Sequence, residues 1–222
     1  MIGKYTDLIF EFLEKGYKDI FFNELSSEYN QLIIRHDIDF DCEFAYEMAK
    51  IEYNLGVKST YFFMLSNSIY NLFSEKNREY VRKIKTLGHK ISVHFDFQVG
   101  DLKKEIDIFE SFFDTEVDIV SIHRPNLELV NQIDVEHTYL SKYFKDIKYF
   151  ADSRGRFRFG HPLKSKEFQE SKSIHLLIHP VWWMSDKKDT IDIMENIIDR
   201  NHEMNKKFFR ENSIPYREHS DD

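Results

Sequence analysis

The chain has 222 residues, of which 41% are hydrophobic and 16% aromatic, so it can bury a substantial core and a disordered chain is excluded. Its formal net charge is −8, and no run of lysine or arginine stands clear of acidic neighbours, which argues against a nucleic-acid partner. The single cysteine, Cys42, excludes an intramolecular disulfide and favours a reducing compartment.

The N-terminal segment, residues 1–20, carries acidic side chains throughout, unlike a signal peptide, and predicts a short amphipathic helix that ends at Gly16. No apolar run approaches the roughly 20 residues of a transmembrane helix. We therefore expect a cytoplasmic protein without an integral membrane segment. Because no linker interrupts the chain, the sequence predicts a single domain over 1–222, with a helical lead-in at 1–30 and a C-terminal helix and tail at 186–222.

Between these ends, strand and helix patterns alternate. The first strand is the clearest, because Leu32, Ile33 and Ile34 suit a strand that is covered on both faces. Strands are predicted at 32–36, 57–65, 89–95, 117–122, 147–152 and 174–179, and helices at 41–56, 74–88, 100–114, in a region up to about 146, and from about 186.

This alternation predicts an α/β fold with a parallel sheet and crossover helices. Nearly every predicted strand is followed by polar residues, and in a parallel fold these strand ends lie at one edge. An open sheet would concentrate function at one switch point, so the distribution favours a closed or nearly closed barrel. No glycine-rich phosphate loop or dinucleotide fingerprint follows any strand.

The first predicted strand ends in an acidic motif. If the extended geometry persists, Arg35, Asp37 and Asp39 share one face. Two close carboxylates raise each other's proton affinity unless a cation intervenes, and a divalent metal or Arg35 would meet that need. The alternative is that Asp39 or Asp41 caps the following helix, which for Asp41 is an equally good interpretation.

Three histidines end later strands. They are His94, His123 and His179, and Asp96 shares the face of His94 if that strand continues. An isolated histidine is usually structural, but three at one edge, facing an acidic pair, favour a site. Aspartate with two histidines is a common ligand set for zinc or a similar divalent ion in hydrolases.

Residues 152–160, DSRGRFRFG, alternate arginine with phenylalanine. On an extended segment Arg154, Arg156 and Arg158 would lie on one side, suited to a phosphate or carboxylate. The alternative is that they form ion pairs with surface acids. Further on, Trp182 and Trp183 follow the last strand, and we expect one in the core and the other at the rim, stacked on a sugar face.

In this order the motifs resemble those of the polysaccharide deacetylase family (the NodB-homology carbohydrate esterases), especially its short cytoplasmic branch associated with surface-glycan biosynthesis. The resemblance covers Leu32 to Trp183 and implies a distorted (β/α)7 barrel. The segment RHDID is similar to the family's first motif. This similarity implies that Asp37 is the catalytic base and Asp39 a metal ligand.

The second motif resembles GHKISVHFDFQ, in which His94 takes the position of a metal ligand. The family's other histidine, four residues on, is Gln98 here, which removes a ligand or leaves His123 to replace it. The segment SIHRPN resembles the Arg/Pro motif, with His123 or Arg124 in place of the arginine that stabilises the transition state. The segment LLIHPVWW resembles the last motif, and this implies that His179 is the general acid.

The resemblance implies a metal-dependent N-deacetylase, a hydrolase of amide C–N bonds, acting on an acetamido sugar in surface polysaccharide or glycan-precursor biosynthesis. The implied cofactor is a divalent metal, with zinc the first expectation. The expected substrate is a small-molecule, nucleotide-linked or lipid-linked sugar. Its binding residues are expected to be Arg124, Asp152, Arg156, Arg158 and Trp182.

Two alternatives stay open. A barrel of this kind that has lost its metal would be a non-catalytic glycan-binding protein, and Gln98 favours that interpretation. The other alternative is a different C–N hydrolase on the same fold, acting on a ureido or formyl group.

Overall fold

The computed structural model describes residues 4–124, 138–139 and 147–220, which belong to two compact units. The smaller unit, Ser185–Asp222, consists of α8 (Thr190–Asn212) and α9 (Ile214–Ser220), and Phe209 of α8 packs against Tyr216 of α9. The larger unit, Met1–Met184, contains the sheet and every predicted site residue.

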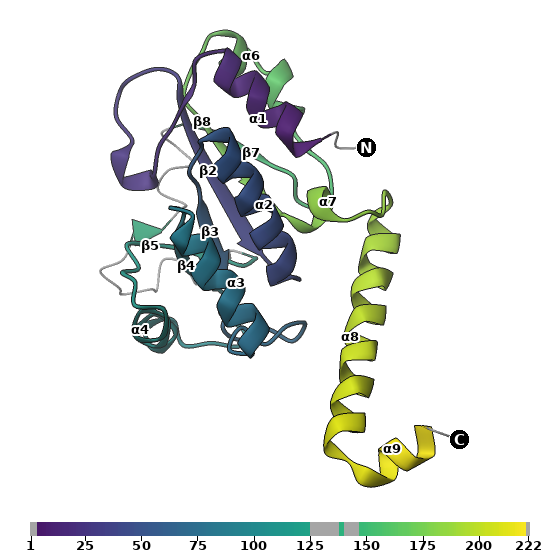
Figure 1. Ribbon diagram of the computed structural model, residues 1–222. Helices are drawn as coiled ribbons and strands as arrows, with labels where there is room; N and C mark the ends of the chain where they lie inside the picture. Colours follow the sequence, from purple (N-terminus) through teal and green to yellow (C-terminus); the bar gives the residue numbers. More distant parts are fainter. Residues whose placement is uncertain (1–3, 125–137, 140–146, 221–222) are drawn as a thin grey trace. The chain divides into compact units, whose positions relative to one another are not determined.

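The larger unit is built around parallel strands (Figure 1). The described strands are β1 (Lys18–Asp19), β2 (Gln31–Ile38), β3 (Thr60–Phe63), β4 (Lys90–Phe95), β5 (Ile119–Ile122), β6 (Thr138–Tyr139), β7 (Lys148–Ala151) and β8 (Ile174–Ile178). All six predicted strands are present, whereas the two-residue strands β1 and β6 were not predicted. So short a strand carries too few residues for an apolar pattern.

The strand order is that of a ring. The hydrogen-bonded path runs β6-β5-β4-β3-β2-β8-β7, so the strands β2 to β8 follow one another in chain order around the sheet, with β2 beside β8. Within the described residues no pairing joins β6 to β7, and 140–146, between them, lie outside the description. The predicted fold class, a distorted (β/α)7 barrel, is confirmed.

The described helices of this unit are α1 (Tyr5–Glu14), α2 (Cys42–Leu55), α3 (Glu75–Thr86), α4 (Leu102–Phe113), α6 (Lys166–Gln169) and α7 (Val181–Met184), with 3₁₀ turns η1 (Phe22–Glu24) and η3 (Pro162–Lys164). The first four helices begin and end close to the predicted positions, whereas the short helices α6 and α7 were not predicted. Capping explains the bounds of α2. Asp41 accepts hydrogen bonds from the backbone N–H groups of Glu43 and Phe44, and Gly56 ends the helix with φ of +72°.

Of two further helix predictions, one is displaced by a few residues and the other lies mostly outside the described residues. The long C-terminal helix starts at Thr190, after the cap Asp189, a few residues later than predicted. Most of the helical region predicted up to about residue 146 lies outside the described residues. None of the described helices is long and apolar enough to cross a membrane.

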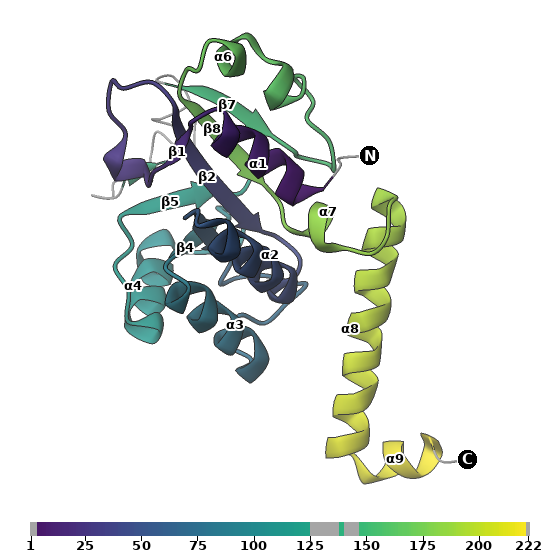
Figure 2. The same cartoon turned by 45° about the horizontal axis from the view of Figure 1, so that its top comes forward.

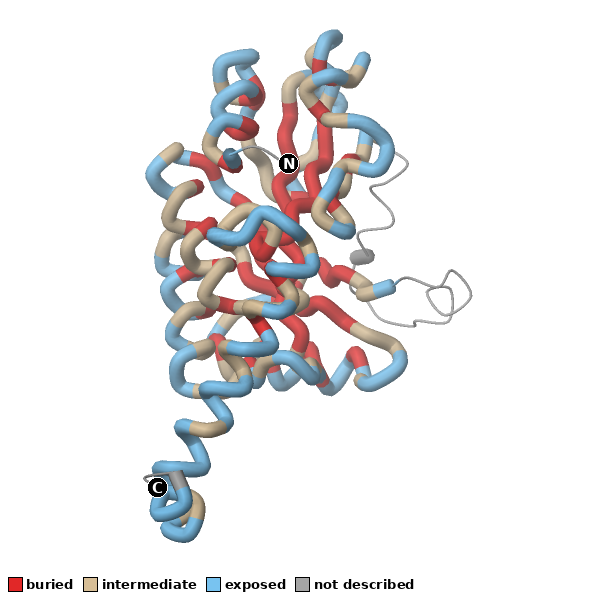
Figure 3. Tube along the Cα trace, turned by 90° about the vertical axis from the view of Figure 1, so that its right-hand side faces the viewer, coloured by how far each residue is buried: buried red, intermediate tan, exposed pale blue. Residues whose placement is uncertain are grey.

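The buried residues concentrate along the strands (Figure 3), and apolar side chains pack on both the outer and the inner face of the sheet. Outside the strands, α1 and α2 cover β2 and β8 (Figure 2), with Leu32 and Ile34 packed beneath them. Inside, Ile33 and Phe62 pack with Phe22 of η1. The next inward side chain of β2, toward the carboxyl ends of the strands, is Arg35, so the apolar filling ends where the polar site begins.

Candidate active site and metal centre

The site begins on the inner face of β2, where Arg35 holds Asp37. Arg35 donates from Nε to Oδ1 at 2.8 Å and from Nη2 to Oδ2 at 2.5 Å, and Ser121 Oγ donates to the same Oδ2 at 3.1 Å. Burial opposes the ionisation of Asp37, but the adjacent Arg35 guanidinium lowers its pKa to about 2. Asp37 is therefore an oriented carboxylate, and Arg35 is the cation that the acidic motif required.

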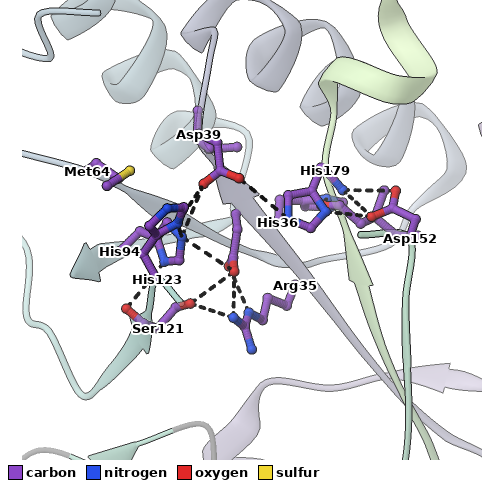
Figure 4. Close-up of polar contacts among 12 residues, drawn as sticks. Arg35, His36, Asp39, Met64, His94, Ser121, His123, Asp152 and His179 are labelled. Carbon is purple, nitrogen blue, oxygen red and sulfur yellow. Dashed lines mark hydrogen bonds and ion pairs between the residues drawn. The ribbon is translucent and has the colours of Figure 1, made fainter. Parts of the chain in front are cut away.

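Asp39 lies at the centre of a second group, with two imidazoles. Its Oδ1 is 3.2 Å from His94 Nε2 and 3.5 Å from His123 Nδ1, and these two nitrogens are 3.2 Å apart. Burial opposes the ionisation of Asp39, but His123 and His94 hold its pKa well below its ordinary value. Figure 4 shows His94 and His123 on one side of Asp39 and His179 on the other.

These donor atoms suit a divalent metal ion. One ligand atom from each of Asp39, His94 and His123 lies within 4.8 Å of the others. His94 Nδ1 faces the carbonyl of Ser121 at 3.3 Å, and because a carbonyl only accepts, the lone pair of a neutral His94 is on Nε2, toward Asp39. The buried Asp39 Oδ1 faces these two ring nitrogens without a well-directed hydrogen bond among the described residues. Two nitrogen donors and one carboxylate oxygen form a three-residue site of the kind that leaves coordination positions open.

His179 enters the site from the end of β8. Its Nδ1 is 2.6 Å from Asp152 Oδ1, its backbone N–H also bonds the Asp152 carboxylate, and its Nε2 points to Asp39 Oδ2 at 3.7 Å. Burial lowers the proton affinity of His179, but Asp152 outweighs it and the pKa is raised to about 9. The imidazole is therefore protonated at neutral pH, with the Nε2–H group directed into the site.

Gln98 occupies the position of a family metal ligand, and the structure shows where it and its possible replacements lie. This side chain is exposed, and its backbone N–H caps the loop by donating to Asp96. Asp96 does not join the Asp39 group, whereas His123 does. Asp41 lies away from the site as the cap of α2.

The loop after β3 supports the backbone at Asp39, a role that sequence reasoning missed. Asn67 Nδ2 donates to the Asp39 carbonyl at 3.0 Å and to Met64 Sδ at 3.2 Å, and Tyr70 OH donates to the Ile38 carbonyl at 2.7 Å. Single Asn and Tyr residues carry no signal for such a role, because the acceptors are backbone atoms about 30 residues earlier in the chain.

Asp152, which was predicted to bind substrate, lies buried behind His179. Its side chain is fully buried, and its oxygens bond His179 and, at 2.7 Å, the indole N–H of Trp183. Trp183 is half-buried and packs against the outer core cluster. Trp182 is also half-buried and lies against Phe40, at 6.1 Å between ring centres.

The arginine segment is a turn and not the extended strand on which the predicted alternation depends. Arg154 and Gly155 both have positive φ, +65° and +71°, and the Arg156 N–H returns to the Asp152 carbonyl at 3.1 Å. Arg156, Arg158 and, after β5, Arg124 are exposed. Arg154 and Arg156 are therefore not alternate residues of one extended segment.

No family model and no curated protein matches this sequence. Solved structures do resemble it. A family 4 carbohydrate esterase from Bacillus anthracis is 16% identical over 90% of this chain and 86% of that chain, with a TM-score of 0.46. The chitin deacetylase from Colletotrichum lindemuthianum is 12% identical over 82% of this chain and 86% of that chain, at 0.48. A family 4 pseudoenzyme from Bacillus anthracis is 12% identical over 81% of this chain and 63% of that chain, at 0.42.

These structures come from the family that the motifs resemble, and they include both deacetylases and a pseudoenzyme. Identities and TM-scores this low do not establish an activity. What this chain does is therefore inferred from its own side chains.

Proposed function

We propose that this protein is a metal-dependent N-deacetylase that hydrolyses the amide of an acetamido sugar. The observation that carries the proposal is the meeting of two groups at Asp39: the Asp39, His94 and His123 donors on one side, and the Asp152-held His179 on the other. A metal site beside a protonated imidazole matches what amide hydrolysis needs, an activated water and an acid for the leaving nitrogen.

Asp39, His94 and His123 would hold the ion, and zinc suits two imidazoles with one carboxylate. A bound divalent ion supplies Lewis acidity, which lowers the pKa of a water molecule and polarises the acyl carbonyl. His123 provides the third donor, so the exposed Gln98 no longer favours a binding protein that has lost its metal.

Asp37 acts as the base. Its carboxylate lies beside the ligands, with Oδ2 at 3.8 Å from His94 Nε2, and Arg35 and Ser121 fix its orientation. It takes one proton from the attacking water while the water oxygen bonds to the acyl carbon. The pairing with Arg35 lowers the basicity of Asp37, and in return it removes the freedom of the carboxylate to rotate away.

His179 acts as the acid. As the C–N bond breaks, Nε2–H protonates the nitrogen, so the products are acetate and the free amine of the sugar. Asp152 keeps the Nδ1 tautomer and orientation fixed and stabilises the imidazolium before the proton is given up. The His179 pKa of about 9 keeps the acid form populated at neutral pH.

The first experiment combines metal analysis with acetate release from acetamido sugars, using protein purified without a chelator or a histidine tag. We expect one divalent ion per chain and acetate release, both lost in Asp39→Asn and His94→Ala. Gln98→Ala is the matched control and should retain both.

Full metal occupancy in either ligand variant would reject the ligand assignment. A metal-loaded wild type that binds glycans without turnover would favour the binding protein, and release of formate or ammonia would favour the other C–N hydrolases.

The acid is tested separately. We expect His179→Ala to lower turnover at least ~100-fold while metal content and melting temperature change little. Near-normal turnover in a folded, metal-loaded His179→Ala protein would remove this residue from the mechanism.

We further propose that the substrate carries a phosphate, as a nucleotide-linked or lipid-linked glycan precursor does. Seven arginines precede residue 184, and four of them lie in the loops after β5 and β7: Arg124, Arg154, Arg156 and Arg158. None of these four forms an ion pair with a described residue, although the chain is acidic overall. Unpaired guanidiniums at the rim of an acidic site suit a phosphate, which they bind in bidentate fashion.

The phosphate preference is measured by comparing kcat/KM for a free acetamido sugar, its 1-phosphate and its nucleotide diphosphate ester. We expect phosphorylation to improve kcat/KM and Arg124→Ala or Arg156→Ala to remove about 10-fold or more of that gain. Arg82→Ala, an arginine of α3 that lies over Phe112, should leave it intact. Equal kcat/KM with and without phosphate would refute this substrate class while leaving the deacetylase assignment standing.

A further inference from the structure

A buried histidine lies directly behind the site, on the outer face of β2. His36 is 0% exposed and stands between Arg35 and Asp37 in the chain, but its ring points to the helices and not to the barrel interior. Its Nδ1 is 3.1 Å from the carbonyl of Ile178, its register partner on β8, and its Nε2 is 2.9 Å from Glu52 of α2.

Glu52, the partner of His36 Nε2, also accepts hydrogen bonds from three hydroxyl groups. Ser59 and Tyr61 donate to Glu52 Oε2 at 2.6 and 2.7 Å, and Tyr5 donates to Oε1. Burial opposes the ionisation of Glu52, but His36, His89 and the Ser59 hydroxyl lower its pKa to about 2. Glu52 is therefore a carboxylate, which can only accept a hydrogen bond, as can the Ile178 carbonyl.

Both ring nitrogens of His36 are engaged, one by the Ile178 carbonyl and the other by Glu52, so the ring bridges α2 and the end of β8. Tyr61 lies against it with ring centres 4.4 Å apart. A buried ring that is paired at both nitrogens holds its neighbours in one geometry.

Two routes lead from this bridge to His179. The first is the chain itself, because the carbonyl that His36 holds belongs to Ile178, the residue before His179. The second passes through side chains, because Tyr5 packs on Trp183 at 5.7 Å between ring centres and Trp183 donates to Asp152. Both routes end on the groups that orient the His179 imidazole.

We propose that His36 is a positioning residue for His179, which it orients by holding the Ile178 carbonyl from an imidazole anchored on Glu52. The inference rests on the proposed function in assigning His179 as the acid. It adds a requirement that the site alone does not contain, namely that β8 is fixed from behind by a side chain of β2.

Two conservative variants each keep one hydrogen bond of His36 and remove the other. In His36→Asn the side-chain amide takes the position of Nδ1 and can still donate to the Ile178 carbonyl. In His36→Gln the amide takes the position of Nε2 and can still bond Glu52. We expect His36→Gln to lower kcat about 10- to 100-fold with KM and metal content unchanged, and His36→Asn to restore most of that loss. Tyr61→Phe, which removes a donor to Glu52 without touching Ile178, should lower the melting temperature and leave kcat unchanged.

Amide hydrogen exchange gives a readout that does not depend on turnover. We expect the His179 N–H, which donates to Asp152, to exchange about 10-fold faster in His36→Gln than in His36→Asn or the wild type. Equal kcat and equal His179 exchange in the two His36 variants, or a kcat loss in Tyr61→Phe that matches His36→Gln, would overturn the inference. A wild type without deacetylase activity would refute the proposed function, and the exchange comparison would still decide whether His36 positions His179.

Discussion

At the residue scale, the proposed acid chemistry depends on the pairing of His179 with Asp152. A histidine at the end of a strand has no protonation preference of its own at neutral pH. The buried Asp152 carboxylate supplies one by accepting from Nδ1 and the backbone N–H. The same aspartate binds Trp183, so its position is fixed by two neighbours at once. In the proposed mechanism Asp152 therefore acts through His179 and not by contact with substrate.

Asp152→Asn keeps the shape of this side chain and removes its charge. Because Asp152 raises the pKa of His179 to about 9, its loss lowers that pKa, and the acid form is then depleted at a lower pH. We expect the alkaline limb of the pH–kcat profile to move down by at least about one unit.

The control for this variant is Asp118→Asn, which neutralises an aspartate that pairs with Lys90 away from the site. Its profile should match that of the wild type. An alkaline limb that stays in place in Asp152→Asn would mean that another group supplies the proton.

At the element scale, β2 serves two functions on its two faces. Its inner face presents Arg35 and Asp37 to the site, and its outer face presents His36 to Glu52 of α2. The period-two alternation of a strand makes this possible, since neighbours in sequence point to opposite sides. The central place of β2, between β3 and β8, lets one strand connect the site to the helical layer.

Glu52→Gln tests the outer face. The pKa of Glu52 is about 2, below its ordinary value of 4.5, so its contribution to stability is complete above about pH 4.5 and is lost as the pH falls toward 2. We expect the substitution to reduce the free energy of unfolding at pH 7 on the order of 3 kcal/mol, measured by urea denaturation. The difference between variant and wild type should shrink as the pH is lowered from 5 toward about 3.

Glu79→Gln removes an exposed helical ion pair with Lys83 and serves as the control, with an expected change below about 0.5 kcal/mol. A Glu52→Gln protein as stable as this control would show that the buried network contributes no net free energy to folding.

At the scale of the whole molecule, the candidate metal centre couples distant parts of the chain. Its ligands come from the ends of β2, β4 and β5, where Asp39, His94 and His123 meet. An unfolded chain does not keep these residues together, so an ion that binds here binds the folded state and stabilises it.

We expect zinc at 100 times its dissociation constant to add about 2.7 kcal/mol to stability, which is a rise of roughly 5–10 °C in the melting temperature for a chain of this size. The shift should be absent in His94→Ala and retained in His161→Ala, a histidine outside the ligand group. A thermal shift of equal size in all three proteins would place the binding elsewhere.

The sequence by itself determined the six longer strands, the long helices between them, the fold class and the edge at which the candidate site lies. Apolar runs and helix caps such as Asp41 and Gly56 are local signals, and the carboxyl ends of parallel strands must lie together. Asp37, Asp39, His94, His123 and His179 could therefore be grouped before any coordinates were known.

Only the tertiary structure decided how these groups pair. It placed His123 beside Asp39 in place of Gln98, Arg35 on Asp37, and Asp152 behind His179, and it made the arginine segment a turn. The physical reason is that most of these contacts join residues far apart in sequence. His179 and Asp152 are 27 positions apart, and Ser121 and Asp37 are 84 positions apart; the pair of Arg35 with Asp37 is the local exception. Such contacts depend on how strands register and which side chains packing buries, and a one-dimensional pattern does not contain that information.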